Sequence, residues 1–264
     1  MGAPMIGLGV SLARNVRPGG GLPPQASALF ARFSAAPDPA RQQAIGALIE
    51  ALVDGGVWSK LDALYVLAAH DGQAALRNWV ADQYNLSEVA APDFLADRGY
   101  SGDGATSYLS CNTAGGLDRF TRNDCHMGIW SLSNLLNAGS ASQECGNTNC
   151  TIVKSSGSGG TVVVRPNTAS GIGSAPSAHF PGLIGWSRFD TSNWELFAHG
   201  LSVGARTDAS AALEDTDFWV CGRADGNFGV NRIAACHFGA ALNAMEWSVM
   251  HAALSSYLDA MGAV

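Results

Sequence analysis

The sequence predicts an α+β protein in which an extended N-terminal arm and a small helical bundle precede an antiparallel β-sandwich with a C-terminal amphipathic helix. Three observations support this prediction. Apolar residues recur at helical spacing between residues 39 and 54 and again after residue 243. They alternate with period two in several runs after residue 105. Between residues 183 and 240, short runs of this kind are separated by a glycine turn about every ten to fifteen residues, which favours a sandwich of antiparallel strands.

Residues 1–25 are predicted to form the extended arm. The glycine run 19–21 and the Pro23-Pro24 pair disfavour regular structure in this segment. The apolar residues at positions 6, 8, 10 and 12 alternate with small residues, as in a strand that binds the edge of another sheet. We therefore expect the arm to lie across a neighbouring subunit, with disorder as the alternative.

Residues 26–90 are predicted to form a helical anchoring domain. Asp38 followed by Pro39 is a typical helix start, and Gly55-Gly56 is a typical end. Ser59 and Asp62 resemble a capping box and predict a second helix. A third helix is expected around Trp79. The apolar stripes that support these helices are Ile45, Leu48, Ile49 and Leu52, then Leu61, Leu64, Tyr65 and Ala68, then Leu76, Trp79 and Val80.

Residues 91–264 are predicted to form the sandwich domain, after a boundary at residues 90–92. Strands are expected at 106–109, 125–132, 151–153 and 161–164, and the Ser/Gly-rich run 155–160 predicts a hairpin loop. Asn243 and Glu246 predict the start of the last helix. Its apolar face is expected to cover an open end of the sandwich and consists of Met250, Leu254, Tyr257, Leu258 and Met261.

Composition excludes several classes of function. Only 14% of the 264 residues are charged and the net charge is −7, so the surface must be rich in small polar residues, which suits a subunit of a larger assembly. No basic stripe of the kind that binds nucleic acid is present. No apolar run reaches the roughly 18 residues that a membrane span needs. The N-terminus lacks the features of an export signal, so we expect folding in a cytoplasm.

The cysteines are expected to be buried free thiols, because disulfides are rare in proteins that fold in a cytoplasm. A bridge between Cys145 and Cys150 is the alternative. Cysteine and histidine are adjacent in Cys125-His126 and in Cys236-His237. Adjacent side chains of a strand point to opposite faces, so neither pair can chelate one metal. The two cysteines or the two histidines can instead meet across strands. The six cysteines are Cys111, Cys125, Cys145, Cys150, Cys221 and Cys236.

No catalytic residue is predicted. The acidic run 214–217 lacks the Glu-x-Asp-x-x-Glu pattern of concanavalin-like glycosidases, and no Gly-x-Ser-x-Gly motif of serine hydrolases is present. Asp215 and Asp217 are weak candidates for calcium ligands, with Asp225 and Asn227 as further oxygen donors. No other cofactor is expected.

Sugar binding needs exposed aromatic rings beside polar donors and acceptors. Among the tryptophans, Trp130, Trp186, Trp194 and Trp219 are the candidates, and core packing is the alternative for each of them. Polar side chains in the predicted loops complete the set. The predicted carbohydrate-binding residues are Arg188, Asp190, Asn193, Trp194, Arg223, Asp225 and Asn227.

Several segments resemble virion structural proteins of tailed bacteriophages and of alphaproteobacterial gene transfer agents. They are residues 56–71 (GVWSKLDALYVLAAHD), 74–79 (AALRNW), 94–104 (FLADRGYSGDG) and 237–242 (HFGAAL). The order of the runs from 183 to 240 also resembles concanavalin-like and laminin-G-like jelly rolls. The cysteine-containing stretch 111–150 departs from the resemblance.

The resemblance implies a head spike, fibre or tail-associated subunit without enzymatic activity. It would form a homo-oligomer, a trimer or pentamer, and contact other virion subunits through the arm and helices. The jelly roll would contact host surface glycan. Such a particle is assembled in the bacterial cytoplasm and released by lysis. The alternatives are a purely structural connector without ligand and a polysaccharide-degrading enzyme.

Overall fold

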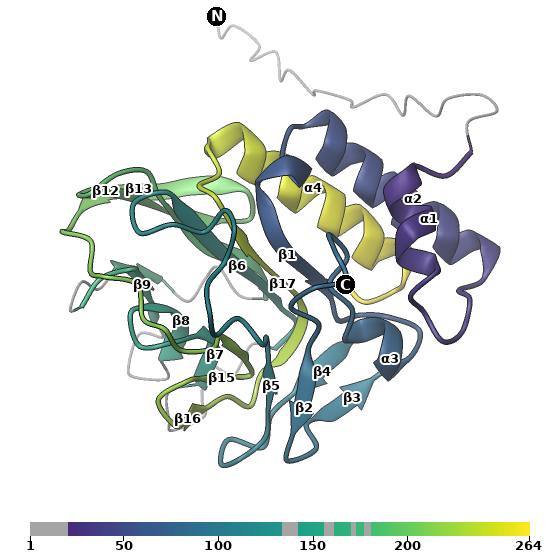
Figure 1. Ribbon diagram of the computed structural model, residues 1–264, viewed down its shortest axis with the longest axis horizontal. Coiled ribbons are helices and arrows are strands. Elements are labelled where there is room, and N and C mark those ends of the chain that lie inside the picture. The colour runs from purple at the N-terminus through teal and green to yellow at the C-terminus, as the bar shows by residue number, and fades with distance from the viewer. Residues whose placement is uncertain (1–20, 134–141, 156–160, 170–172, 177–180) are drawn as a thin grey trace, which may run out of the picture.

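The computed structural model describes residues 21–133, 142–155, 161–169, 173–176 and 181–264, which form three layers (Figure 1). Two antiparallel sheets face each other, and a layer of helices covers the outer face of the first sheet. The predicted α+β class with a sandwich and a C-terminal helix is confirmed. The predicted arm up to residue 20 and the Ser/Gly run 156–160 lie outside the described residues.

The first sheet has eight strands in the order β13-β12-β11-β6-β17-β4-β3, with β1 also paired to β17. The strand expected at 125–132 is confirmed as β6. The strands are β1 (Leu61–Val66), β3 (Asp93–Leu95), β4 (Gly99–Ser101), β6 (Cys125–Ser131), β11 (Gly182–Arg188), β12 (Asn193–Ala198), β13 (Leu201–Thr207) and β17 (Arg232–Gly239).

The second sheet has seven strands in the order β10-β9-β8-β7-β14-β5-β2, and the short hairpin β15–β16 packs beside β7. The expected strands at 151–153 and 161–164 are confirmed within β8 and β9. The strands are β2 (Ser87–Val89), β5 (Tyr108–Ser110), β7 (Ser142–Gly146), β8 (Cys150–Ser155), β9 (Thr161–Pro166), β10 (Gly173–Pro176), β14 (Trp219–Val220), β15 (Gly222–Arg223) and β16 (Asn227–Phe228).

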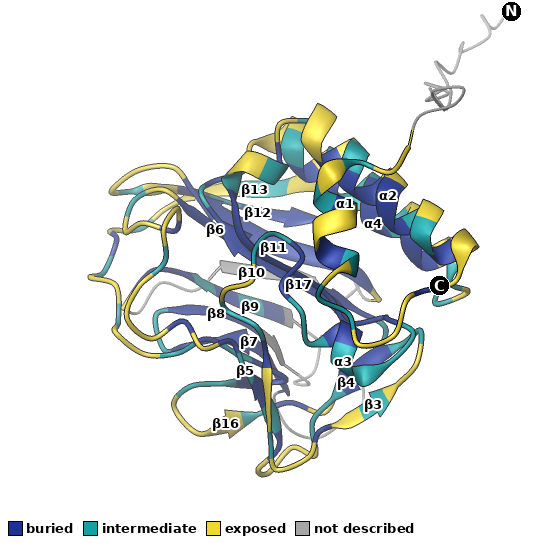
Figure 2. Ribbon diagram, turned by 45° about the vertical axis from the view of Figure 1, so that its right-hand side comes forward, coloured by how far each residue is buried: buried dark blue, intermediate teal, exposed yellow. Residues whose placement is uncertain are grey.

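The helical layer consists of α1 (Pro24–Phe30), α2 (Pro39–Asp54) and α4 (Ala244–Ala260), whose buried sides face the first sheet (Figures 1 and 2). Asp38 accepts a hydrogen bond from the Arg41 amide at 3.0 Å, which confirms the predicted start of α2. Asn243 and Glu246 form the predicted capping box of α4. The arm was expected to extend to residue 25, but α1 begins at Pro24, because proline suits the first turn of a helix.

The position of α4 differs from the prediction, since it covers a face of the first sheet and not an open end of the sandwich. Trp247 explains this placement. A side chain at Gly128 or Gly185, which pair with each other on β6 and β11, would lie 2.8 or 2.3 Å from the Trp247 ring. The two glycines therefore leave a depression in the sheet that holds this indole, which is fully buried.

The helix predicted from residue 59 is wrong. A short 3-10 turn (Trp58–Lys60) leads into β1, all six residues of which are buried between the helices and the second sheet. A strand buried on both faces has no alternation of polar and apolar residues, so its pattern does not distinguish it from a buried helix. The side chain of Asp62 does not cap a helix and accepts hydrogen bonds from the amides of Arg119 and Phe120.

The third predicted helix, expected around Trp79, is wrong, because the short helix α3 (Gly72–Ala75) ends before Leu76 and no helix contains Trp79 or Val80. Asn78 explains why the chain turns away. Its side chain donates to the carbonyls of Asp62 and Gln83 and accepts from the amides of Leu64 and Val80. These hydrogen bonds hold the loop against β1 and leave Trp79 buried in the helical layer.

Strand β1 lies within the range 26–90, yet it pairs with β17 in the first sheet. The sheet is thus built from chain segments on both sides of residue 90. The division at residues 25 and 90 stays a prediction about folding units, and its consequence for a fragment is developed in the Discussion. No helix among the described residues has the length and apolar character of a membrane span.

Candidate functional site

Three aromatic rings stack on the outer face of the second sheet. Tyr108 on β5 and Trp219 on β14 lie face to face, with ring centroids 3.7 Å apart and an interplanar angle of 18°. Phe228 on β16 lies 6.0 Å from the Trp219 ring and 6.1 Å from the Tyr108 ring. All three rings are half-buried, so each keeps part of its surface in contact with solvent. We call these three residues the aromatic stack.

Strand alternation explains why the stack faces outward. Leu109 and Val220, the neighbours of Tyr108 and Trp219, are fully buried in the core between the two sheets. Because successive side chains of a strand point to opposite faces, the two aromatic rings must lie on the outer face. Gly222 leaves room for the hairpin, since a Cβ there would lie 3.3 Å from the Trp219 ring and 3.4 Å from the Tyr108 Cβ.

The β15–β16 hairpin, which carries Phe228, also carries a cluster of three polar side chains. Arg223 makes a two-point ion pair with Asp225, with N–O distances of 2.9 and 2.7 Å, and the Asn227 amide donates to Asp225 at 2.7 Å. Burial by itself would raise the pKa of Asp225, but the hydrogen bonds from Arg223 and Asn227 outweigh burial, and the pKa lies below its ordinary value. The carboxylate therefore stays ionised and fixes both neighbours in place.

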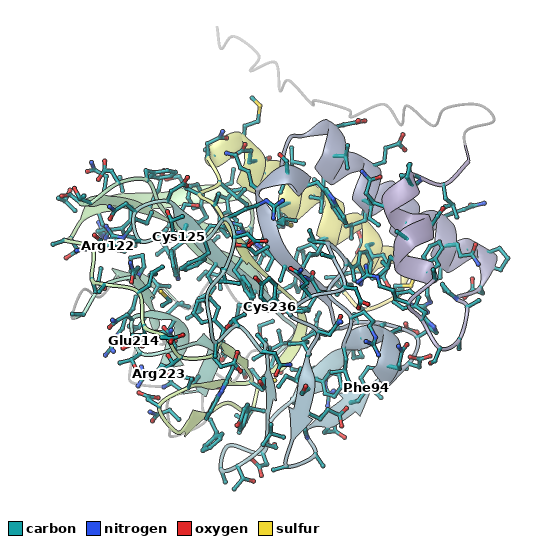
Figure 3. All side chains as sticks on the ribbon, in the orientation of Figure 1. Phe94, Arg122, Cys125, Glu214, Arg223 and Cys236 are labelled. Carbon is teal, nitrogen blue, oxygen red and sulfur yellow. The ribbon has the colours of Figure 1, made fainter. Side chains whose placement is uncertain are left out.

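The sequence-predicted residues thus form two separate clusters. Arg223, Asp225 and Asn227 gather in the β15–β16 hairpin, which packs beside β7 of the second sheet, and Arg223 is labelled in Figure 3. The other four lie at the turn between β11 and β12 of the first sheet. The structure does not place the two clusters on one sheet.

The β11–β12 cluster is engaged within the fold. Arg188 was expected in a surface loop, but it ends β11, is fully buried, and donates to the carbonyls of Pro166, Asp190 and Asp208. Burial lowers the pKa of Arg188. Trp194 is 1% exposed and donates to Asp208 at 2.8 Å.

The exposed side chains of the same turn stabilise its backbone. Asp190 accepts hydrogen bonds from the amides of Ser192 and Asn193, each at 2.7 Å, and from the Asn193 side chain. These hydrogen bonds lower the pKa of Asp190 to about 2. The carbohydrate-binding role predicted for Arg188, Asp190, Asn193 and Trp194 stays a prediction.

Only one of the four candidate tryptophans belongs to the aromatic stack. Trp130, Trp186 and Trp194 are buried, as their alternative interpretation required, whereas Trp219 is half-buried. Tyr108 and Phe228 were missed from the sequence. The Asp225-Gly226 pair could have revealed Phe228, because an Asp-Gly pair predicts a β-hairpin turn and Phe228 lies on the strand that follows it.

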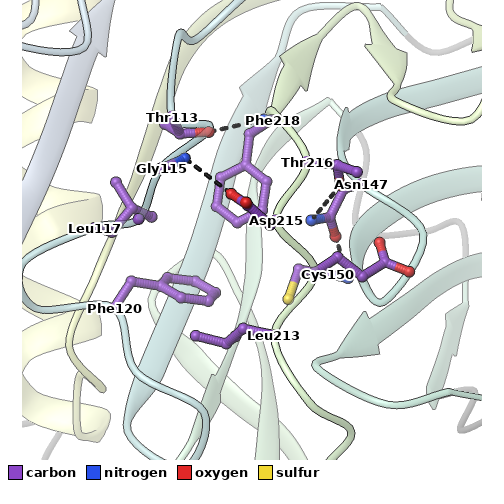
Figure 4. A pocket seen from close by; sticks show the side chains of 12 residues that line it. Thr113, Gly115, Leu117, Phe120, Asn147, Cys150, Leu213, Asp215, Thr216 and Phe218 are labelled. Carbon is purple, nitrogen blue, oxygen red and sulfur yellow. Dashed lines mark hydrogen bonds between the residues drawn. The ribbon is translucent and has the colours of Figure 1, made fainter.

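A small cleft of about 260 Å³ lies between the loops 113–120 and 213–218 (Figure 4). Its lining combines the acidic side chains of Glu214 and Asp215 with the apolar side chains of Leu117, Phe120, Leu213 and Phe218. Asp215 accepts a hydrogen bond from the Gly115 amide at 2.9 Å, and Glu214 accepts one from the Thr148 amide at 3.1 Å. Both carboxylates therefore hold the walls of the cleft together.

The calcium candidates Asp215 and Asp217 also bind protein donors. Asp217 accepts hydrogen bonds from the Ser110 hydroxyl at 2.5 Å and from the Thr113 amide at 2.7 Å. In the described ranges, no three His, Cys, Asp or Glu side chains are grouped so that they could hold a metal ion. Calcium binding stays a prediction.

The cysteines and histidines lie inside the fold. All six cysteines are buried and free, as expected, and Cys145 and Cys236 approach to 3.5 Å between their sulfur atoms. The predicted meeting of the two histidines across strands is confirmed, since His126 Nε2 and His237 Nδ1 are 3.0 Å apart. His126 Nδ1 donates to the Ala240 carbonyl, so its Nε2 accepts the proton of His237. Burial lowers the pKa of both imidazoles.

Comparison with known proteins identifies the class of fold. No family model and no curated protein sequence matches the chain. Among solved structures, it is similar to Trypanosoma rangeli sialidase at 9% identity and a TM-score of 0.52, covering 81% of this chain and 39% of that chain. It is also similar to the receptor-binding domain of botulinum neurotoxin C/D mosaic serotype at 8% identity and a TM-score of 0.50, covering 74% of this chain and 51% of that chain.

The chain therefore spans about half or less of the length of these two structures. At such low identity the likeness shows the fold alone, which is that of a β-sandwich protein.

Proposed function

We propose that this chain is a glycan-binding β-sandwich subunit that recognises polysaccharide through the aromatic stack and the β15–β16 hairpin. The observation on which the proposal rests is that the hairpin which adds Phe228 to the aromatic stack also carries the polar cluster of Arg223, Asp225 and Asn227. Sugar rings have apolar faces that pack on aromatic rings and hydroxyl groups that bind charged and amide side chains. This combination of residues provides both kinds of contact.

The proposal extends to the particle in which the subunit acts. The segments that resemble phage and gene-transfer-agent proteins support a head spike or fibre subunit, held to other virion subunits by its N-terminal region. In this proposal the subunit is assembled in the bacterial cytoplasm, is released by lysis and contacts host surface polysaccharide. A trimer or pentamer would present several copies of the stack, and such multivalency raises avidity about 10²- to 10⁴-fold over a single weak site.

We propose binding without cleavage. A retaining glycosidase needs two carboxyl groups about 5 Å apart that both act on the substrate. The carboxylates of Glu214 and Asp215, beside the cleft, accept hydrogen bonds from backbone amides of different loops. Their positions support a structural role in the walls of the cleft.

The test is binding of the purified full chain to a panel of immobilised bacterial surface polysaccharides. Trp219→Ala should weaken binding to the recognised polysaccharide by about tenfold, which corresponds to about 1.4 kcal/mol. Phe189→Ala is the matched control, because Phe189 is an aromatic residue that is 41% exposed beside the β11–β12 turn. Equal loss in both variants, or binding unchanged in Trp219→Ala, would contradict the proposal. Failure of the chain to bind any polysaccharide would favour a connector without ligand.

A further inference from the structure

Strand β13 is the longest unpaired sheet edge in the described part of the chain. It has seven residues and pairs with β12 alone. The other terminal strands are shorter: β3 and β2 have three residues each, and β10 has four and ends in Pro176. The outer side of β1 is covered, because Asn78 and Trp79 form hydrogen bonds with Leu64.

The pairing pattern shows which groups of β13 lack a strand partner. The Asp208 amide donates to the carbonyl of Ser192, which lies opposite it one residue beyond the paired range. Bonded and non-bonded pairs alternate along an antiparallel ladder. Arg206 and Gly204 therefore turn their backbone groups toward β12, and Ala205 and Thr207 turn theirs away from the sheet.

The composition of this edge is unusual, because exposed edges are normally protected by charge, proline or short length. β13 contains one charged residue, Arg206. Leu201 at its start is 69% exposed, and Met245 in the first turn of α4, which contacts β13, is 77% exposed. This edge therefore offers backbone hydrogen bonds together with uncovered apolar side chains.

Residues 6–12 of the same sequence have the length and composition of a strand that could pair with the β13 edge. This segment has seven residues, as β13 has, and apolar residues alternate in it with Gly7, Gly9 and Ser11. Residues 2–13 contain no charged side chain, so the segment places no charge against Leu201 or Met245. An extended strand of this composition suits addition to a sheet edge.

We propose that residues 6–12 of one copy of this chain add a strand to the β13 edge of a second copy. The contact is heterologous, because an N-terminal segment of one subunit binds a different surface of the next. Repeated around a rotation axis, such contacts close into a ring, and without closure they form a filament. The proposal concerns assembly and does not depend on glycan binding.

Sedimentation velocity of the full chain over a range of concentrations tests the proposal. Wild type should self-associate, and Ala205→Pro should weaken association by about tenfold, because proline removes an outward N–H and is tolerated on a free edge. Ala205→Ser is the matched control, since it keeps this N–H and should associate like wild type. Circular dichroism and thermal unfolding verify that the variants are folded.

The other half of the contact is tested on the N-terminal segment. Leu8→Asp combined with Val10→Asp should weaken association as Ala205→Pro does, and adding Ala205→Pro to it should weaken association no further. Val16→Asp, outside the alternating segment, should leave association unchanged. A chain that is monomeric at every concentration would overturn the proposal. Association that is equally strong in Ala205→Pro, or in the double aspartate variant, would also overturn it.

Discussion

Residues 91–264 are predicted not to fold as an independent unit, because β1 belongs to the first sheet. Removing residues 1–90 removes the side chains of Leu61, Leu64, Tyr65 and Val66, all fully buried. At roughly 1.5–3 kcal/mol for each large side chain, their burial contributes on the order of 6–12 kcal/mol. The stability of a whole domain is typically about 5–15 kcal/mol. The loss is therefore comparable to the entire stability of the fold.

Thermal and urea unfolding of the fragment 91–264, followed by circular dichroism, measures this prediction against the full chain. The fragment should show no cooperative transition. A cooperative transition near that of the full chain would refute the reasoning and support a domain boundary at residue 90.

A point substitution tests the same argument in the intact chain. Leu64→Ala should lower the free energy of unfolding by about 2–5 kcal/mol, the usual cost of a cavity at a buried leucine. Leu95→Ala is the control at a residue 52% exposed. It should change the free energy of unfolding by no more than about 0.5 kcal/mol. Equal effects in the two variants would show that β1 is not buried as described.

Three further predictions follow from the interior and the hairpin. Burial lowers the pKa of His126 from 6.5 to about 3 and lowers that of His237 well below 6.5. Just below pH 6.5, the two imidazoles are therefore protonated in the unfolded chain and neutral in the folded chain. The free energy of unfolding should therefore be unaffected by these histidines above pH 6.5 and should fall as the pH drops below 6.5. Equal free energies of unfolding at pH 7 and pH 5, measured by urea denaturation, would contradict this prediction. Burial raises the pKa of the Cys111 and Cys125 thiols, and all six cysteines are buried, so a thiol reagent should label none of them in the native protein and six in denaturant. Gly222→Val should weaken glycan binding by displacing Trp219 and Tyr108, while Gly226→Ala, at a site with no atom within 4 Å of an added Cβ, should affect the turn without touching the rings.

Local signals in the sequence predicted the starts of α2 and α4 correctly. Asp38 with Pro39 and Asn243 with Glu246 act through side chains that bind backbone amides within three residues, so no distant contact is needed. Features of this kind depend on nearby residues alone.

The elements that sequence analysis missed depend on residues far apart in the chain. β1 is a strand because β17 pairs with it, and the 61–66 run has no polar face to reveal this. The aromatic stack needs β5 and β14 to pair and the β15–β16 hairpin to fold over them. Tyr108 and Phe228 lie in strands of three and two residues, which are too short to show a period.

The predicted residues Arg223, Asp225 and Asn227 lie together in one hairpin, and their role in carbohydrate binding stays a prediction. The β11–β12 residues were expected in a surface loop, but the structure engages them within the fold. Arg188 appeared to follow a strand and was expected in a loop. Its burial depends on the carbonyls of Pro166 and Asp208, which come from other segments.

The most direct test of the account is a titration of the labelled protein with the oligosaccharide selected by the binding panel, followed through the tryptophan indole and backbone amide NMR signals. The seven tryptophans provide internal controls. We predict that the Trp219 indole signal shifts with saturable binding, whereas those of the buried Trp186, Trp194 and Trp247 do not. Saturable shifts at Asn193 and Asp190 with an unchanged Trp219 signal would place the glycan at the β11–β12 turn and contradict the account.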